Sequence, residues 1–338
     1  MSEIKGLSGL QNFGNTCYIN TAIQCLSNTP LLKEFFFCDE IDRYLKKKNL
    51  LTTELHKLLT GIYEENCIIS PVSFFRGVKS IGRKKKYELN FSDQNDIQEF
   101  IIFIINELHE ELKREVNITI SGEIKNKEDQ MAYDSMTGWK NYFKNNYSKI
   151  IELFYGQIVS RIKVVDKEIE SLTYSPICVF SLPIPQTNDN SPISIYRCFD
   201  LLTEDTLLDG DNKWKYDKDN QYYSANQSIK IWKFPPVFII HLKRFTNMGL
   251  KISSKIDFPV NDLNLQDYGV GYEKFHSKYE LYAISNHIGN TNMGHYYAYC
   301  KNSDDGKWYN FDDDSVTEMD ESDLVTNNAY CLFYKKIF

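Results

Sequence analysis

Apolar residues recur at helical spacing through the first third of the chain. Between Ile19 and Leu26 they follow one face of a helix, and the pattern continues through "TTELHKLLTGIY" at residues 52–63. The strongest pattern is "FSDQNDIQEFIIFIINELHEELK" at residues 91–113, whose apolar positions share one side. Its acidic residues come early, where the helix dipole favours negative charge. These patterns predict an α-helical lobe.

The sequence pattern changes after about residue 115. Residues 116–150 are polar and weakly patterned, which predicts a connector. Apolar and polar residues alternate from Ile158 to Val164 and indicate a strand, and "FPPVFIIHLKRF" at residues 234–245 is typical of a buried strand bounded by prolines. Four more segments that resemble strands follow near the C-terminal end. The chain therefore predicts an α+β fold, with a helical lobe, a mostly antiparallel β lobe and a cleft between them.

Composition and charge narrow the function classes. The 338 residues are 42 % hydrophobic and 25 % charged, with a net charge of −7, which argues against a general nucleic-acid binder. The longest apolar stretches are shorter than the ~20 residues that a bilayer requires, and the N-terminal segment does not resemble a secretory signal. Eight irregularly spaced cysteines favour reduced thiols. We expect a cytoplasmic or nuclear protein that binds neither nucleic acid nor membrane.

Four residues could form a cysteine hydrolase centre. Cys17 lies where a glycine- and asparagine-containing turn becomes a helix, and unpaired N–H groups favour a thiolate there. His295 follows a glycine at the start of a predicted strand, and Asp312 comes seventeen residues later, within reach of a hairpin. Asn12 lies in the same turn as Cys17, so its amide could face a developing oxyanion. The set is chemically coherent.

The motifs around these residues resemble those of the ubiquitin-specific proteases. "GLQNFGNTCYINTAIQCL" is similar to the family's Cys box, and "YELYAISNHIGNTNMGHYYAYCKN", "KWYNFDDDSV" and "AYCLFYKK" are similar to its His box. Between them, "DQNDIQEF" and "PPVFIIHLKRF" resemble a helix start and a palm strand of the family. The motifs occur in the family's order from residue 7 to residue 334.

The resemblance implies a papain-like cysteine peptidase with a helical thumb, a β-rich palm and β fingers. It implies one catalytic domain over residues 1–338. Within that domain, the thumb spans 1–115, the connector 116–150, the fingers with part of the palm 151–235, and the rest of the palm 236–338.

The resemblance also implies the role of each site residue. Cys17 is the nucleophile, His295 the general base and then acid, Asp312 the group that orients the imidazole, and Asn12 the oxyanion donor. Asp313 matches a second acidic residue that assists in many members of the family. The implied substrate is the C-terminal tail of ubiquitin on ubiquitinated proteins, cleaved by a monomer without a cofactor. Asp96 and Glu99 match acidic residues that bind the tail arginines, where charge-assisted pairs give strength and orientation. The residues that match the wall of the tail channel are Gln94, Phe245, His287 and Tyr296.

One feature departs from the family pattern. Most members carry two CxxC pairs in the fingers that bind structural zinc, and this sequence contains no CxxC. Val164 and Lys167 stand where the first pair is expected, and Cys178 and Cys198 are two thiols twenty residues apart. We expect fingers without metal, held by strand pairing and aromatic packing.

Three alternatives remain open from the sequence. A ubiquitin-binding pseudoenzyme would keep the fold and lose the chemistry. The presence of all four residues of the cysteine hydrolase centre argues against it. A papain-like protease that processes a polyprotein would share the triad but not the substrate. A protease for a ubiquitin-like modifier is the nearest alternative, because related tails also end in two glycines.

Overall fold

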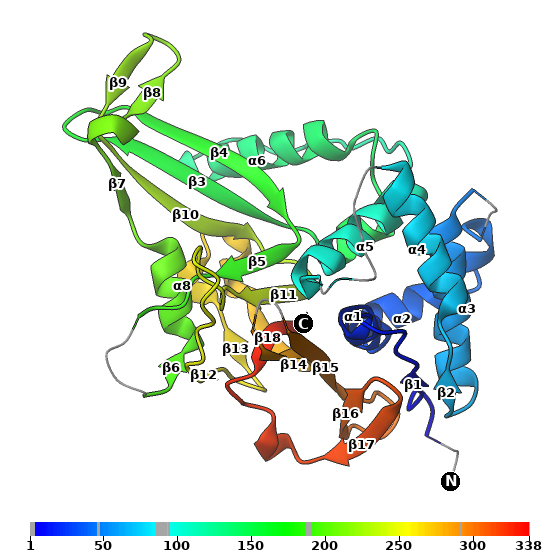
Figure 1. The fold of residues 1–338 in the computed structure, drawn as a ribbon. Helices are drawn as coiled ribbons and strands as arrows, with labels where there is room; N and C mark the ends of the chain where they lie inside the picture. Colours follow the sequence, from blue (N-terminus) through cyan, green and yellow to red (C-terminus); the bar gives the residue numbers. More distant parts are fainter. Residues whose placement is uncertain are drawn as a thin grey trace.

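The N-terminal part of the chain is a helical lobe. The computed structural model describes residues 4–45, 48–85, 93, 95–186, 191–290 and 293–337. In Figure 1 the blue and cyan helices of this lobe lie together on one side of the molecule. The lobe comprises α1 (Cys17–Ser27), α2 (Pro30–Phe36), η1 (Ile41–Arg43), α3 (Leu50–Glu64), α4 (Val72–Lys84), α5 (Ile97–Leu112) and the parallel pair β1 (Gly9–Leu10) and β2 (Ile68–Ile69).

The predicted apolar faces of these helices are buried. Every residue of α1 is buried, and α5 buries the apolar side that its sequence predicts. Asp96 precedes α5, and its carboxylate accepts the Gln98 N–H at 2.7 Å, so the helix begins with a side-chain cap.

An eight-stranded sheet forms the palm. Its order is β17-β16-β15-β14-β18-β11-β5, with β13 paired to β14, and all described pairs are antiparallel except β11 with β5. The last strand, β18, is therefore inserted between β14 and β11, in the middle of the sheet. The strands are β5 (Val179–Leu182), β11 (Val237–Leu242), β13 (Leu263–Asn264), β14 (Lys278–Gly289), β15 (Gly294–Lys301), β16 (Trp308–Asp312), β17 (Ser315–Met319) and β18 (Ala329–Lys336).

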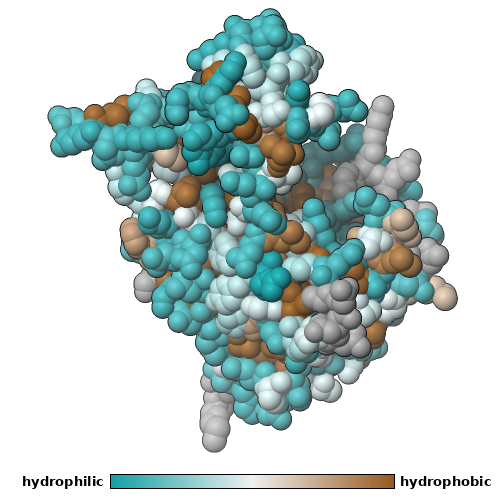
Figure 2. All heavy atoms as spheres, turned by 90° about the vertical axis from the view of Figure 1, so that its left-hand side faces the viewer, coloured by the Kyte–Doolittle hydropathy of each residue, from teal (hydrophilic) through white to brown (hydrophobic). Residues whose placement is uncertain are grey.

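A second sheet, of order β4-β3-β10-β7, forms the fingers. In Figure 1 it extends away from the palm and carries the β8–β9 hairpin at its far end. Figure 2, which turns this side toward the viewer, shows that hydrophilic residues cover most of the face. The fingers comprise β3 (Gly156–Val164), β4 (Glu170–Ile177), β7 (Thr206–Leu208), η2 (Gly210–Asn212), β8 (Trp214–Tyr216), β9 (Gln221–Tyr223) and β10 (Ala225–Lys233).

The palm sheet separates two hydrophobic cores. Along β11, Val237 and Ile239 belong to the core shared with the helical lobe, whereas Phe238 and Ile240 belong to the core on the other face. Because side chains alternate along a strand, a continuous apolar run indicates a strand buried on both faces, as the sequence predicts. The second core includes residues of α8 (Ile195–Thr203), of the pair β6 (Ile193–Ser194) and β12 (Ile256–Asp257), and of the 3₁₀ helix η3 (Gln266–Tyr268). Two further 3₁₀ helices, η4 (Tyr272–Phe275) and η5 (Glu321–Asp323), bury none of their residues.

The segment 116–150 contains one helix, and the start of a second, that its weak pattern did not predict. α6 (Lys127–Phe143) lies against β4, and α7 (Lys149–Phe154) begins just before residue 150. Only Ser135 and Phe143 of α6 are buried. Because α6 buries so few side chains, its sequence is mostly polar. Its apolar residues therefore show no helical period, and the sequence pattern did not predict the helix. Asn126 caps α6 by accepting the Asp129 N–H at 2.9 Å.

The fold brings the chain's N-terminal turn against the hairpin that follows β16. The Leu10 N–H donates to the Asp313 carbonyl at 2.7 Å. A Cβ on Gly9 would lie 2.3 Å from the Asp314 carbonyl oxygen, so only glycine fits this approach. α1 also lies against β15 and β14. The starts of α1 and β15 and the end of β16 therefore meet at one place. Among the described residues, no helix is both long enough and apolar enough to cross a membrane.

Candidate active site

Cys17 is the first residue of α1 and is 4 % exposed. The preceding turn is held by side chains, because the Thr16 hydroxyl accepts the Phe13 N–H at 2.9 Å and donates to the side-chain oxygen Oδ1 of Asn12 at 3.0 Å. The Thr16 N–H also donates to that Asn12 oxygen at 3.3 Å. The sulfur is thus fixed beside the unpaired N–H groups of a helix start.

His295 connects the thiol to a carboxylate. Its Nε2 lies 2.6 Å from Asp312 Oδ1, across the neighbouring strands β15 and β16. The pKa of His295 is raised to about 9, first by the hydrogen bond with Cys17 and further by Asp312, against the effect of burial. The imidazole is therefore protonated at neutral pH, with Cys17 on one side and Asp312 on the other. This arrangement can deliver a thiolate to a carbonyl carbon and a proton to the leaving group.

Asp313 contacts two asparagines of the α1 segment. Its Oδ2 accepts the Asn12 amide at 2.8 Å, and its Oδ1 accepts the Asn20 amide at 2.8 Å. Asn20 also donates to the Leu10 carbonyl at 3.1 Å. Because Thr16 holds the oxygen of Asn12 and Asp313 holds one amide hydrogen, the second N–H of Asn12 has a fixed direction. Its predicted role as an oxyanion donor stays a prediction.

Aromatic side chains form one continuous cluster beside the triad. The His287 ring lies 4.6 Å from Tyr296, 5.5 Å from Phe245 and 5.8 Å from Tyr330. Burial lowers the pKa of His287 to about 4, so this ring is neutral. The structure thus brings together Phe245, His287 and Tyr296, three of the residues predicted to line the tail channel.

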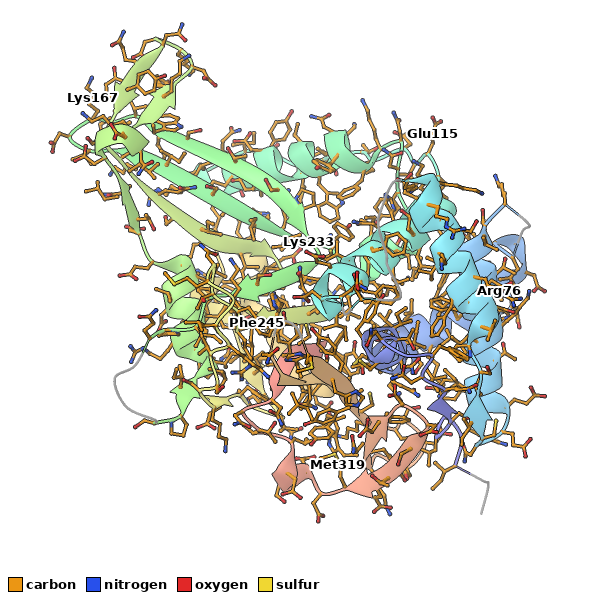
Figure 3. All side chains as sticks on the ribbon, viewed as in Figure 1. Arg76, Glu115, Lys167, Lys233, Phe245 and Met319 are labelled. Atoms are coloured by element: carbon orange, nitrogen blue, oxygen red, sulfur yellow. The ribbon has the colours of Figure 1, made fainter. Side chains whose placement is uncertain are left out.

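The turn that carries Phe245 is anchored by a fully buried arginine. Arg244 donates to the backbone carbonyls of Ala329 at 2.6 Å and of Ile252 and Ser254, each at 2.9 Å. These bonds tie the segment after β11 to the start of β18 and fix the place of Phe245. Figure 3 shows Phe245 in the middle of the molecule, far from Lys167 at the tip of the fingers.

Two of the three polar residues predicted for the tail site, Asp96 and Glu99, lie at the start of α5. Asp96 is half-buried, and its Oδ2 accepts the Tyr330 hydroxyl at 2.5 Å. Glu99, in the first turn, is exposed, and no hydrogen bond or ion pair joins its side chain to another residue in the described ranges. Gln94 lies outside the described residues.

The sequence analysis did not single out Tyr330. It is 1 % exposed and contacts His241, with ring centroids 4.9 Å apart, as well as the aromatic cluster. The signal was present in "AYCLFYKK", because a tyrosine inside a fully buried strand requires an acceptor for its hydroxyl.

The expected absence of a zinc site stays a prediction. Lys167, where a zinc ligand was expected, places its ammonium 4.1 Å from the centre of the Tyr223 ring in β9. Cys178 and Cys198 belong to different cores, and burial raises the pKa of each thiol to about 11. Within the described ranges, the one group of His, Cys, Asp and Glu side chains close enough to share an ion is His295, Asp312 and Asp313, whose polar atoms already bond one another or the two asparagines.

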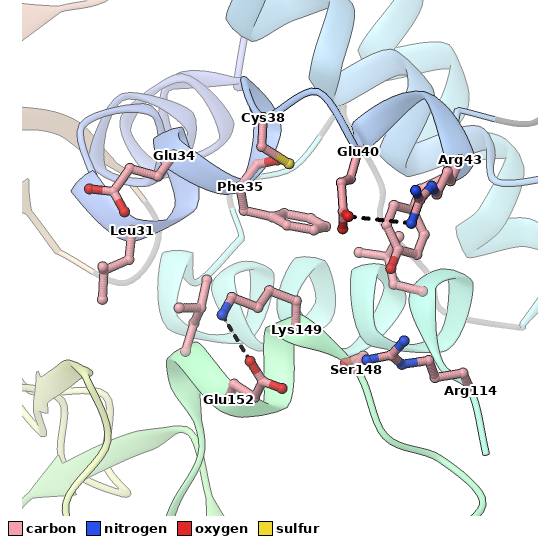
Figure 4. Close-up of a pocket in the computed structure, with 13 residues that line it drawn as sticks. Leu31, Glu34, Phe35, Cys38, Glu40, Arg43, Arg114, Ser148, Lys149 and Glu152 are labelled. Atoms are coloured by element: carbon pink, nitrogen blue, oxygen red, sulfur yellow. Dashed lines mark hydrogen bonds and ion pairs between the residues drawn. The ribbon is translucent and has the colours of Figure 1, made fainter. Parts of the chain in front are cut away.

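A cavity of about 440 Å³ lies away from the triad, between α2, η1, the end of α5 and α7. Figure 4 shows its mixed rim, where Arg43 pairs with Glu40 and Lys149 pairs with Glu152. None of the predicted site residues lines this cavity. The predicted site residues that the structure describes lie instead at the junction of α1, α5 and the palm sheet.

Comparison with known proteins identifies the family. Residues 8–334 match the family described as "Ubiquitin carboxyl-terminal hydrolase". The chain belongs to this family. The resemblance seen in the sequence and the predicted α+β papain-like fold are both confirmed.

Several relatives and solved structures resemble the chain over almost its full length. Human "Ubiquitin carboxyl-terminal hydrolase 2" is 32 % identical over 345 residues, which cover 98 % of this chain and 55 % of that protein. The Drosophila melanogaster "Ubiquitin carboxyl-terminal hydrolase Usp2" is 34 % identical, covering 98 % of this chain and 35 % of that protein. This chain therefore spans about half the length, or less, of these relatives.

Among solved structures, the "SAGA Ubp8/Sgf11/Sus1/Sgf73 DUB module bound to ubiquitin aldehyde" has a chain with a TM-score of 0.75 and 25 % identity. The match covers 100 % of this chain and 71 % of that one.

Proposed function

We propose that the protein is a cysteine deubiquitinase that hydrolyses the peptide or isopeptide bond after the C-terminal glycine of ubiquitin. The observation that carries the proposal is the place of His295, whose Nε2 lies 2.6 Å from Asp312 and whose pKa is raised first by Cys17, in a member of the ubiquitin carboxyl-terminal hydrolase family. The intact set of these three residues argues against a pseudoenzyme, because each group has the partner that catalysis requires.

In the proposed reaction, the Cys17 thiolate attacks the carbonyl carbon of the terminal glycine. The negative oxygen that forms accepts hydrogen bonds from the Cys17 backbone N–H and from the free N–H of Asn12. Protonated His295, oriented by Asp312, then gives its proton to the leaving amine, and a thioester remains on Cys17. Neutral His295 next takes a proton from water, which attacks the thioester and releases the tail.

The aromatic cluster would guide the tail to Cys17. The half-buried ring of Phe245 and the buried rings of His287 and Tyr296 would leave little room beside the reacting carbonyl, which suits a tail that ends in two glycines. The fingers expose Leu207 and Tyr222, at 58 % and 64 %, which offer apolar surface to a folded ubiquitin. We propose ubiquitin and ubiquitinated proteins as substrates, with no nucleic acid or membrane required, and a monomer as the active form.

A reducing compartment suits this chemistry, because the nucleophile has to remain a thiolate. We therefore propose a cytoplasmic or nuclear location.

The decisive experiment is to incubate the protein with ubiquitin that carries a C-terminal electrophile. Mass spectrometry should find one adduct, on the peptide that contains Cys17, and none in the Cys17→Ala variant. Parallel probes built on ubiquitin-like modifiers test the nearest alternative. A faster adduct with one of them would move the substrate assignment to that modifier, and no adduct with any probe would overturn the proposal.

A further inference from the structure

Both carboxylate oxygens of Asp96 are already engaged inside the protein. Oδ1 accepts the Gln98 N–H at 2.7 Å, and Oδ2 accepts the Tyr330 hydroxyl at 2.5 Å. The first bond caps α5, and the second joins α5 in the thumb to β18 in the palm. We refer to the second contact as the thumb–palm bond. Asp96 is half-buried, so both of its bonds serve the protein's own structure before any substrate arginine arrives.

The hydroxyl of Tyr330 depends on this carboxylate. Burial and the nearby Asp96 charge raise the pKa of Tyr330 far above its usual value, so the phenol stays a hydrogen-bond donor. The side chain is 1 % exposed and is surrounded by the rings of His241, Phe245 and Tyr296. Removal of the acceptor would leave a buried hydroxyl without a partner, which is costly.

The residues on either side of Asp96 make two more contacts with the active site. The Asn95 amide donates to the hydroxyl of Tyr18 at 3.1 Å, and Tyr18 follows the nucleophile directly. The Ile97 backbone N–H faces the hydroxyl of Tyr296, which follows His295 directly, and it works against the burial that raises the pKa of that phenol. Three consecutive residues at the start of α5 therefore face α1, β18 and β15.

We propose that Asp96 is a positioning residue that, through the thumb–palm bond to Tyr330, holds the start of α5 where it aligns Cys17 with His295. In this arrangement Glu99, exposed one turn further along α5, is the carboxylate that receives a tail arginine. The assignment of Glu99 rests on the proposed function, whereas the alignment of Cys17 with His295 is a property of the protein alone.

Two variants separate this role from direct binding of an arginine. Tyr330→Phe removes the hydroxyl and leaves the Asp96 carboxylate intact and more available, so direct binding predicts no loss of activity. If the thumb–palm bond aligns the active site, Tyr330→Phe and Asp96→Ala should each lower kcat about tenfold. This is the effect expected from the loss of one buried hydrogen bond. The double variant should be no worse than the more severe single one. Glu99→Gln should instead raise KM for a ubiquitin C-terminal amide reporter and leave kcat near the wild-type value.

A measurement without ubiquitin tests the alignment directly. Iodoacetamide alkylates thiolates, so its rate at Cys17, followed by mass spectrometry across a pH series, reports the pairing of Cys17 with His295. Asp96→Ala and Tyr330→Phe should lower this rate and change its pH profile, whereas Glu99→Gln should not. The exposed thiol of Cys67 serves as an internal reference that all variants should leave unchanged. This readout remains valid if the protein proves inactive on ubiquitin.

A matched control is available in the same strand. Tyr334 is also fully buried in β18, and its hydroxyl donates to the Pro259 carbonyl at 2.7 Å, without contact to α5. Tyr334→Phe should lower the melting temperature and leave the Cys17 alkylation profile unchanged. Asp96→Asn, which keeps a helix cap, replaces Asp96→Ala if the latter does not fold. Tyr330→Phe with unchanged kcat and alkylation would overturn the proposal, as would an Asp96→Asn effect confined to KM.

Discussion

Replacement of Asn12 by alanine tests its proposed role as an oxyanion donor. The amide of Asn12 has two hydrogens, of which one donates to Asp313 at 2.8 Å, and its oxygen is held by Thr16. One N–H is therefore left for the oxyanion, beside the backbone N–H of Cys17. Loss of one such donor costs a factor of about 10²–10³ in kcat, or about 2.7–4 kcal/mol. We expect the upper half of this range, because the truncation also removes a hydrogen bond from Asp313 next to the triad.

The assay is hydrolysis of a ubiquitin C-terminal amide reporter by Asn12→Ala, with kcat and KM measured separately. KM should change little, because the oxyanion exists only after attack. The control is Asn66→Ala. The side-chain amide of Asn66 also makes two hydrogen bonds, because its oxygen accepts the Leu7 N–H and its nitrogen donates to the Ile4 carbonyl. These bonds lie in an exposed turn without contact to the triad. A fall in kcat of less than about threefold, under ~1 kcal/mol, would refute the role of Asn12 and leave backbone donors to stabilise the oxyanion.

Three further outcomes follow from the site and the fingers. Cys17→Ala should abolish turnover and retain ubiquitin binding by calorimetry, because the sulfur supplies covalent chemistry; turnover at the wild-type rate would contradict the mechanism. Since the raised pKa of His295 keeps its ring protonated up to about pH 9, kcat/KM should fall as the pH rises through that value. Asp312→Asn should move this fall to lower pH, and an unmoved profile would be inconsistent with the assigned pair. A strong chelator under reducing conditions should leave activity and melting temperature unchanged, whereas Lys167→Ala, which removes the cation over Tyr223, should destabilise the protein by about 0.5–1 kcal/mol. One bound zinc per chain by elemental analysis would contradict this prediction.

The sequence by itself determined the elements whose own residues carry a strong pattern. The apolar side of α5, the fully buried run of β11 and the helix that begins at Cys17 are all local features, because helices and strands impose periods of 3.6 and 2 on the residues that they bury. The motifs around Cys17, His295 and Asp312 also indicated the family. The sequence did not predict α6, because a helix with only two buried residues has almost no hydrophobic periodicity.

Only the tertiary structure decided which side chains meet. Asp96 and Tyr330 are 234 positions apart, and they touch because the last strand, β18, is inserted between β14 and β11 rather than added at an edge of the sheet. The same insertion places Ala329 beside Arg244 and so fixes the turn of Phe245. Strand order depends on how both cores pack together, so the hydrophobic periodicity of a single segment does not predict it. A carboxylate that the motif identified as a ligand for substrate is, in the fold, bound by a helix start and a buried phenol.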